Sequence, residues 1–174
     1  MQFLILGILL DGPLALYDVH KRFTGGISLF YAASFGSIQR ALRQLEAQGW
    51  VLPADAADTR RRRKLYAVTD TGRQTWREWM LSPLSGSDAE PLMLARIYLL
   101  GSLPAGERRE CIAVVRARLT EDGNALTSLA TELDSAEIPA ASAEVFRYRR
   151  ATLDYGIRSH TLALTWLDQL EHDA

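Results

Sequence analysis

The sequence SFGSIQRALRQLEAQG, residues 34–49, has the pattern of a single amphipathic helix with a start signal and a stop signal. Ser34 belongs to the residue types that favour a helix N-cap, and Gly49 to the type that commonly follows a helix end. The apolar positions follow the i, i+3, i+4, i+7 spacing of a core-facing stripe: Ile38, Ala41, Leu42 and Leu45. We therefore expect a helix from residue 34 to about residue 48 with one buried face.

The opposite face of this helix is rich in cations and in small or polar side chains. At about 100° per residue, this outer face holds Gly36, Arg40, Arg43 and Ala47, flanked by Ser37, Gln39 and Gln44. A solubilising surface usually mixes both charge signs, whereas the only acid here is Glu46, near the helix end. The pattern favours a surface that approaches an anion, and ordinary helix surface is the alternative.

The segments around this helix predict a small domain spanning residues 1–82. Helical patterns cover residues 3–10 and 14–23, strand-like runs cover 50–53 and 64–69, and a further helix runs from about residue 70 to 81. Three helices, a two-stranded hairpin and a helix are the order of a winged helix-turn-helix domain. In that fold the third helix enters a DNA groove, and the hairpin, or wing, lies beside it.

The remainder of the chain has no strand signal. A segment with Pro, Gly and Ser at residues 83–89 predicts a hinge, and helical patterns follow over about 90–100, from Pro104 to about 133, and from 143 to 170. The last two helices are long, amphipathic and short of local partners, so we expect them to pack on a second copy of the chain. The predicted fold class is mainly α with a small β-hairpin: a winged helix-turn-helix domain followed by an all-helical dimerisation domain, residues 90–174.

The net charge of −1 hides two halves of opposite sign. Residues 1–83 hold 11 basic and 7 acidic residues, a net charge of +4, whereas residues 84–174 hold 9 basic and 14 acidic residues, a net charge of −5. Five of the N-terminal cations lie together at residues 60–64, in the predicted wing. This asymmetry predicts a DNA-facing N-terminal half and an acidic half that is free to dimerise.

Several other classes of protein are disfavoured by the sequence. The apolar run at residues 1–10 is too short to span a membrane, and the single cysteine, Cys111, cannot form an intrachain disulfide, which fits a cytoplasmic protein. The chain has no nucleophile elbow, phosphate loop or metal-ligand spacing, and His160 lies on an apolar stripe without a second ligand. We expect no enzyme activity, no cofactor, no metal and no membrane partner.

The sequence resembles the PadR-like transcriptional regulators, in the branch with a longer helical C-terminal region. The stretches that carry the resemblance are residues 4–9, 12–14, 17–19, 34–38, 41–42, 45–46, 64–69 and Gly72. The resemblance implies a cytoplasmic, homodimeric, DNA-binding regulator, and some members respond to small aromatic acids. Gln39 and Arg40 stand where the family usually has Tyr-Pro, so the resemblance does not imply an operator sequence.

The residues expected to contact double-stranded operator DNA come from the third helix, the segment before it and the wing. They are Tyr31, Ser34, Gly36, Ser37, Gln39, Arg40, Arg43, Arg60, Arg61, Arg62, Arg63 and Lys64. Arg can bind guanine O6 and N7 with two hydrogen bonds, and Gln can do the same with adenine N6 and N7. The wing cations and Arg43 suit phosphate oxygens. For Tyr31, packing beneath the third helix is an equally good interpretation.

Two further interpretations remain open at the level of sequence. The aromatic residues that could frame a pocket for a small aromatic or phenolic effector are Trp76, Trp79, Tyr98, Phe146, Tyr155 and Trp166, and core packing is their alternative. The winged helix could also serve as a protein-interaction adaptor without sequence-specific DNA binding. The favoured function is a DNA-binding transcriptional regulator, and repression is favoured over activation.

Overall fold

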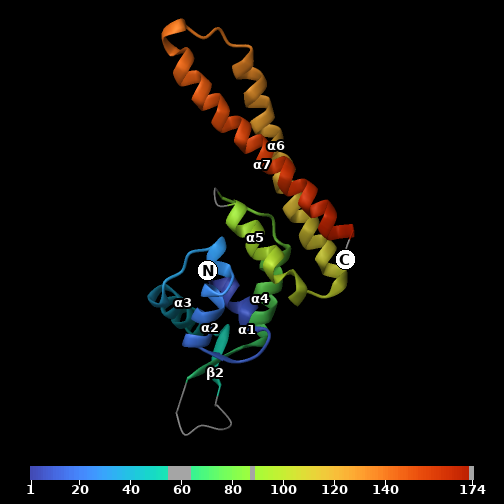
Figure 1. Cartoon of the computed structure of the whole chain (residues 1–174). Coiled ribbons are helices and arrows are strands. Elements are labelled where there is room, and N and C mark those ends of the chain that lie inside the picture. The colour runs from blue at the N-terminus through green and yellow to red at the C-terminus, as the bar shows by residue number, and fades with distance from the viewer. Residues whose placement is uncertain (55–63, 87–88, 173–174) are drawn as a thin grey trace. The chain divides into compact units, whose positions relative to one another are not determined.

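The computed structural model describes residues 1–54, 64–86 and 89–172 and divides into two compact units, Met1–Cys111 and Ile112–Ala174 (Figure 1). The elements are α1 (Gln2–Leu9), β1 (Leu14–Ala15), α2 (Leu16–Thr24), η1 (Ile27–Leu29), α3 (Phe35–Ala47), β2 (Val51–Ala54), β3 (Leu65–Val68), α4 (Asp70–Leu81), α5 (Ala89–Leu99), η2 (Leu100–Ser102), α6 (Ala105–Asp134), η3 (Ala140–Ser142) and α7 (Ala143–His172). The predicted fold class is confirmed: a mainly helical chain with a small antiparallel sheet in the winged-helix order.

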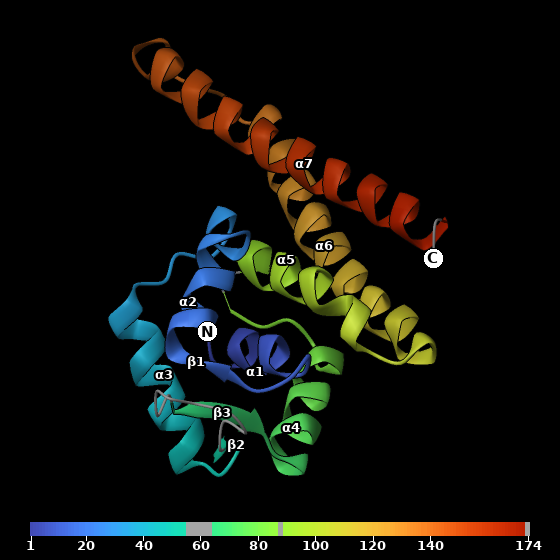
Figure 2. The same ribbon diagram turned by 60° about the horizontal axis from the view of Figure 1, so that its bottom comes forward.

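Helix α1 forms the centre of the N-terminal unit. Its residues 4–9 are all buried, and the helix contacts α2, α3, α4, α5 and β3. Figure 2 shows α1 in the middle of this unit, surrounded by the other helices and the sheet. A helix that is apolar on all sides is stable only when it is buried on all sides, and this explains the unbroken apolar run at the start of the chain.

Helix α3 matches the prediction closely. The predicted stripe of Ile38, Ala41, Leu42 and Leu45 is buried. Ser34 is the N-cap, and its Oγ accepts a hydrogen bond of 3.1 Å from the backbone N–H of Ser37. The helix is therefore held by its inner face, and its outer face is left to solvent.

The sheet contains one strand more than predicted. Its order is β1-β3-β2, with β3 antiparallel to both neighbours, and β1 pairs Leu14 with Tyr66 and Ala15 with Leu65. The sequence assigned residues 14–23 entirely to a helix, and that assignment was wrong for Leu14 and Ala15. A strand of two residues is too short to show a period of two, so only its pairing with β3 identifies it.

The first compact unit ends later than the predicted hinge at 83–89. Ala95, Leu99, Leu103 and Cys111 belong to the same hydrophobic core as α1. Helix α5 and the start of α6 are therefore part of the N-terminal unit, because their apolar side chains complete its core.

A buried arginine joins α5 to the end of α4. Arg96 is only 2% exposed, and its guanidinium donates hydrogen bonds to the carbonyl oxygens of Met80 and Ser82 and to Ser82 Oγ. The guanidinium also lies 5.1 Å from the ring centroid of Trp79. Burial lowers the pKa of Arg96. Its hydrogen bonds satisfy carbonyl groups that the end of a helix leaves without partners, and they hold α5 against the end of α4.

In the C-terminal unit, the part of α6 from Ile112 onward and α7 lie side by side in opposite directions (Figure 1). Arg116 of α6 binds Asp168 and Glu171 near the end of α7, each at 2.6 Å, and Arg150 near the start of α7 binds Asp134 at 2.7 Å. Gly156 of α7 packs closely on α6, because a methyl group added there would lie 3.3 Å from Leu126 Cδ1. In the described residues, no helix combines the length and apolar character needed to span a bilayer.

A single alanine substitution tests the junction between the sheet and α4. A methyl group at Gly72 would lie 2.1 Å from the carbonyl oxygen of Trp50, and that oxygen already accepts a hydrogen bond from the Thr69 N–H. We expect Gly72→Ala to lower the free energy of unfolding by about 2–3 kcal/mol, measured by chemical denaturation. Gly106→Ala is the control, because a methyl group there meets no atom within 4 Å. A Gly72→Ala chain as stable as the control would contradict this packing.

Candidate nucleic-acid interface

The outer face of α3 presents two unpaired cations. Arg40 and Arg43 are exposed and lie one turn apart, and within residues 1–54, 64–86 and 89–172 neither forms an ion pair. At Gly36, on the same face, an added methyl group would meet no atom within 4 Å. The start of this face is therefore open to a large ligand, and its charge is positive.

Ser34 and Ser37 close the first turn of α3 on itself. Besides the capping bond, the Ser37 hydroxyl donates a hydrogen bond of 2.8 Å to the Ser34 carbonyl oxygen. Both side chains thus have a structural role at the helix start, where free backbone N–H groups favour an anion. Their predicted contact with DNA stays a prediction.

The flank of α3 that faces α1 is occupied by internal contacts. Gln44 accepts a hydrogen bond of 3.1 Å from Gln2, and Tyr31, which precedes α3, accepts one of 3.0 Å from the terminal amino group of Met1. Tyr31 is half-buried and packs against the hydrophobic core. Between the two interpretations of Tyr31 left open by the sequence, this environment favours packing.

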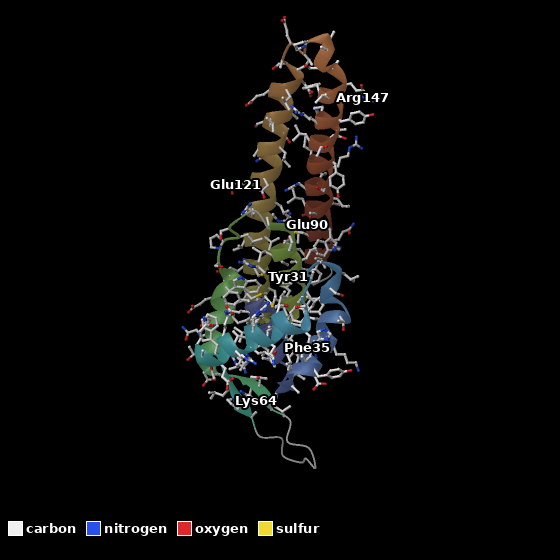
Figure 3. All side chains as sticks on the ribbon, turned by 90° about the vertical axis from the view of Figure 1, so that its left-hand side faces the viewer. Tyr31, Phe35, Lys64, Glu90, Glu121 and Arg147 are labelled. Carbon is white, nitrogen blue, oxygen red and sulfur yellow. The ribbon has the colours of Figure 1, made fainter. Side chains whose placement is uncertain are left out.

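The single acid of α3 is bound by the lysine at the base of the wing. Lys64 Nζ lies 2.8 Å and 2.7 Å from the two carboxylate oxygens of Glu46 and 5.0 Å from the ring centroid of Tyr66. The hydrogen bond to Glu46 raises the pKa of Lys64. Figure 3, in which α3 faces the viewer, shows Lys64 below this helix and Phe35 at the start of it. Sequence reasoning assigned Lys64 to DNA and missed its partner, because the two residues are far apart in the chain.

The wing arginines Arg60, Arg61, Arg62 and Arg63 lie outside the described residues, and their phosphate contacts stay a prediction.

Gln39 lies one turn after Phe35 on α3 and is half-buried. The structure thus brings Gly36, Gln39, Arg40 and Arg43 together on or beside one face, and it connects Lys64 to the end of the same helix.

An exposed phenylalanine at the start of α3 was missed. Phe35, the first residue of the helix, is 45% exposed, and its ring packs edge-to-face with the ring of His20 on α2, at 5.3 Å between centroids. The available signal was a large aromatic residue at the first position of this helix, three residues before Ile38 and therefore at the edge of the apolar stripe.

The predicted effector residues fall into both compact units. In the N-terminal unit Trp76 is buried in the core, Trp79 stacks on Phe3 at 4.9 Å between ring centroids, and Tyr98 is half-exposed beside Phe30. In the C-terminal unit Tyr155 is exposed, whereas Phe146 and Trp166 are partly buried. Core packing accounts for Trp76. The effector pocket itself stays a prediction.

The described residues do not gather three metal-ligating side chains at any one place. Cys111 is buried, and this burial raises the pKa of its thiol to about 11. A thiol with so high a pKa is protonated at neutral pH and is a poor nucleophile. Its environment therefore indicates packing.

Comparison with known proteins identifies the N-terminal unit. Residues 5–78 match the model of the transcriptional regulator PadR-like family. These residues therefore form a PadR-like domain. This PadR-like domain contains most of α1, the sheet, α3 and most of α4, and it includes every residue for which DNA contact was predicted.

The similarity to known regulators extends beyond the PadR-like domain. The negative transcriptional regulator PadR of Bacillus subtilis is 27% identical over 168 residues, which cover 95% of this chain and 86% of the relative. A probable transcriptional regulator of Mycobacterium tuberculosis is 26% identical over 171 residues, covering 88% and 86%. Among solved structures, Bacillus subtilis PadR in complex with operator DNA is 22% identical, with a TM-score of 0.45 over 97% of this chain and 96% of that one.

The contact between Lys64 and Glu46 can be tested by chemical labelling, because Lys21 is the only other lysine of the chain. The raised pKa lowers the fraction of Lys64 that is neutral at a given pH, and only the neutral amine reacts with an acylating reagent. We expect Lys64 to be acylated several-fold more slowly than the exposed Lys21, measured by peptide mass spectrometry at pH 8–9. Glu46→Gln should make the two rates similar. Equal rates in the unmodified chain would exclude a persistent ion pair.

Proposed function

We propose that the chain is a cytoplasmic transcriptional regulator that binds operator DNA as a homodimer and represses transcription. The observation that carries this proposal is the outer face of α3, where Arg40 and Arg43 have no ion-pair partner among the described residues and the one acid is bound by Lys64. A PadR-like domain around this helix supports the same function. The relative from Bacillus subtilis is a negative regulator, which favours repression.

In the proposed complex, α3 lies in the major groove. The N-terminal residues of a recognition helix contact base edges, so Gln39 and Arg40 read bases, and Arg43, one turn after Arg40, binds the phosphate backbone. Gly36 lets the backbone of α3 approach the DNA, since nothing fills the space in front of it. The wing arginines at 60–63 add phosphate contacts, which strengthen binding to any sequence and make it sensitive to salt.

The homodimer is supported by a stripe of large apolar side chains on α7 that stays exposed in the single chain. Tyr148, Tyr155 and Leu162 recur every seven residues and are 59%, 74% and 71% exposed. The inner stripe of the same helix, with Leu153 and Leu167, is buried and lies about 100–180° away around the helix axis. A stripe of large apolar side chains at heptad spacing is the pattern of a helix that packs on another helix.

Arg40 can be tested against a matched arginine. We expect Arg40→Ala to weaken binding to a selected duplex by about 1–3 kcal/mol, and to relax the base preference at one position in each half-site. Fluorescence anisotropy at fixed salt measures both effects. Arg109→Ala removes the same charge from an exposed position at the start of α6 and should leave affinity unchanged. If Arg40→Ala and Arg109→Ala change the affinity and the base preference equally, Arg40 does not read a base. Equal effects are also what a protein-interaction adaptor without sequence-specific DNA binding would show.

The α7 stripe predicts the oligomeric state. Leu162→Glu places a carboxylate in the proposed interface, where its desolvation is costly, and should weaken the dimer at least about tenfold in sedimentation experiments. Thr161→Glu is the control, because Thr161 is exposed and lies off the stripe. A monomeric unmodified chain, or a dimer indifferent to Leu162→Glu, would exclude this interface.

A further inference from the structure

Phe35 is an exposed apolar residue at the start of α3. It lies at the edge of the apolar stripe, on the flank that separates this stripe from the outer face with Gly36, Arg40 and Arg43, and Gln39 follows one turn later on the same flank. Single exposed apolar residues are common on protein surfaces, so exposure alone says little. The position is informative, because the first turn of a recognition helix is the part that reaches the base edges.

The ring of Phe35 is held on one side and free on the other. His20 of α2 packs edge-to-face with it at 5.3 Å between centroids and an angle of 67° between the rings. The Phe35 residue nevertheless stays 45% exposed. The contact limits the ring to few orientations, so little conformational freedom remains to be lost when a ligand covers the exposed part.

We propose that Phe35 reads a thymine in the operator through the C5 methyl group. A phenylalanine side chain has no hydrogen-bonding group, and the thymine methyl is the apolar group that unmodified bases present in the major groove. This inference rests on the proposed DNA-binding function and assigns a base to one position of the half-site. Gln39, on the same flank, suits adenine, so the two residues together select A·T pairs.

The test removes the methyl group and changes nothing else on the DNA. The full chain first selects its preferred duplexes from a random pool of unmodified DNA at low salt. Each thymine of a selected duplex is then replaced in turn by uracil, which lacks the C5 methyl. We expect one thymine in each half-site to lose about fourfold in affinity on replacement, the effect of one buried methyl group. In Phe35→Ala, replacement at that position should have no effect.

Leu29→Ala is the matched control, because Leu29 is an exposed apolar residue that lies before α3, in η1. It should keep the uracil response of the unmodified chain. Phe35→Leu, which keeps an apolar contact, should keep part of it. A second measurement uses the unmodified chain: 5-iodouracil at the responsive position should form a photocrosslink to Phe35, identified by mass spectrometry.

The outcomes separate this inference from the function on which it rests. If no duplex is enriched at low salt, the proposed DNA-binding function fails. If duplexes are enriched but no thymine position responds to uracil, or if Phe35→Ala keeps the response, the methyl contact is wrong and the DNA-binding function stands. A crosslink to another residue at the responsive position would also overturn the assignment to Phe35.

Discussion

The packing of the apolar stripe of α3 onto α1 is the contact on which the rest of the candidate site depends. Leu42 and Leu45 are fully buried, and α1, which α3 contacts, is buried along residues 4–9. Once this face of α3 points inward, the geometry of a helix places Arg40 and Arg43 outward. The same core thus provides both the stability of the N-terminal unit and the orientation of its charged surface.

Local sequence patterns predicted the helices and the two faces of α3, because capping residues and apolar spacing are short-range signals. They did not reveal contacts between distant residues. Strand β1 is recognised only by its pairing with β3, and Glu46 and Lys64 meet because the chain returns to the end of α3 at the base of the wing. The ring of His20 beside Phe35 is a similar case, since it depends on how α2 and α3 pack.

Helix α7 has apolar residues on two faces, and the sequence pattern does not tell these two faces apart. The sequence predicts one long amphipathic helix here, which packs on a second copy of the chain. In the structure Leu153 and Leu167 are buried, whereas Tyr155 and Leu162 are exposed on the opposite side of the helix. An amphipathic pattern indicates that a face is apolar, but it does not indicate whether α6 or a second chain covers that face. Burial in the single chain supplies this distinction.

In the proposed function, the cations of the N-terminal unit bind the phosphate backbone of DNA. The most direct measurement is the affinity of the full chain for a random-sequence duplex as a function of salt concentration, by fluorescence anisotropy. Because each neutralised phosphate contributes about 0.9 to the slope, a dimer with several arginine contacts per subunit predicts a plot of log K against log salt with a slope of about −4 or steeper. Absent binding at low salt, or binding that salt does not weaken, would exclude these phosphate contacts.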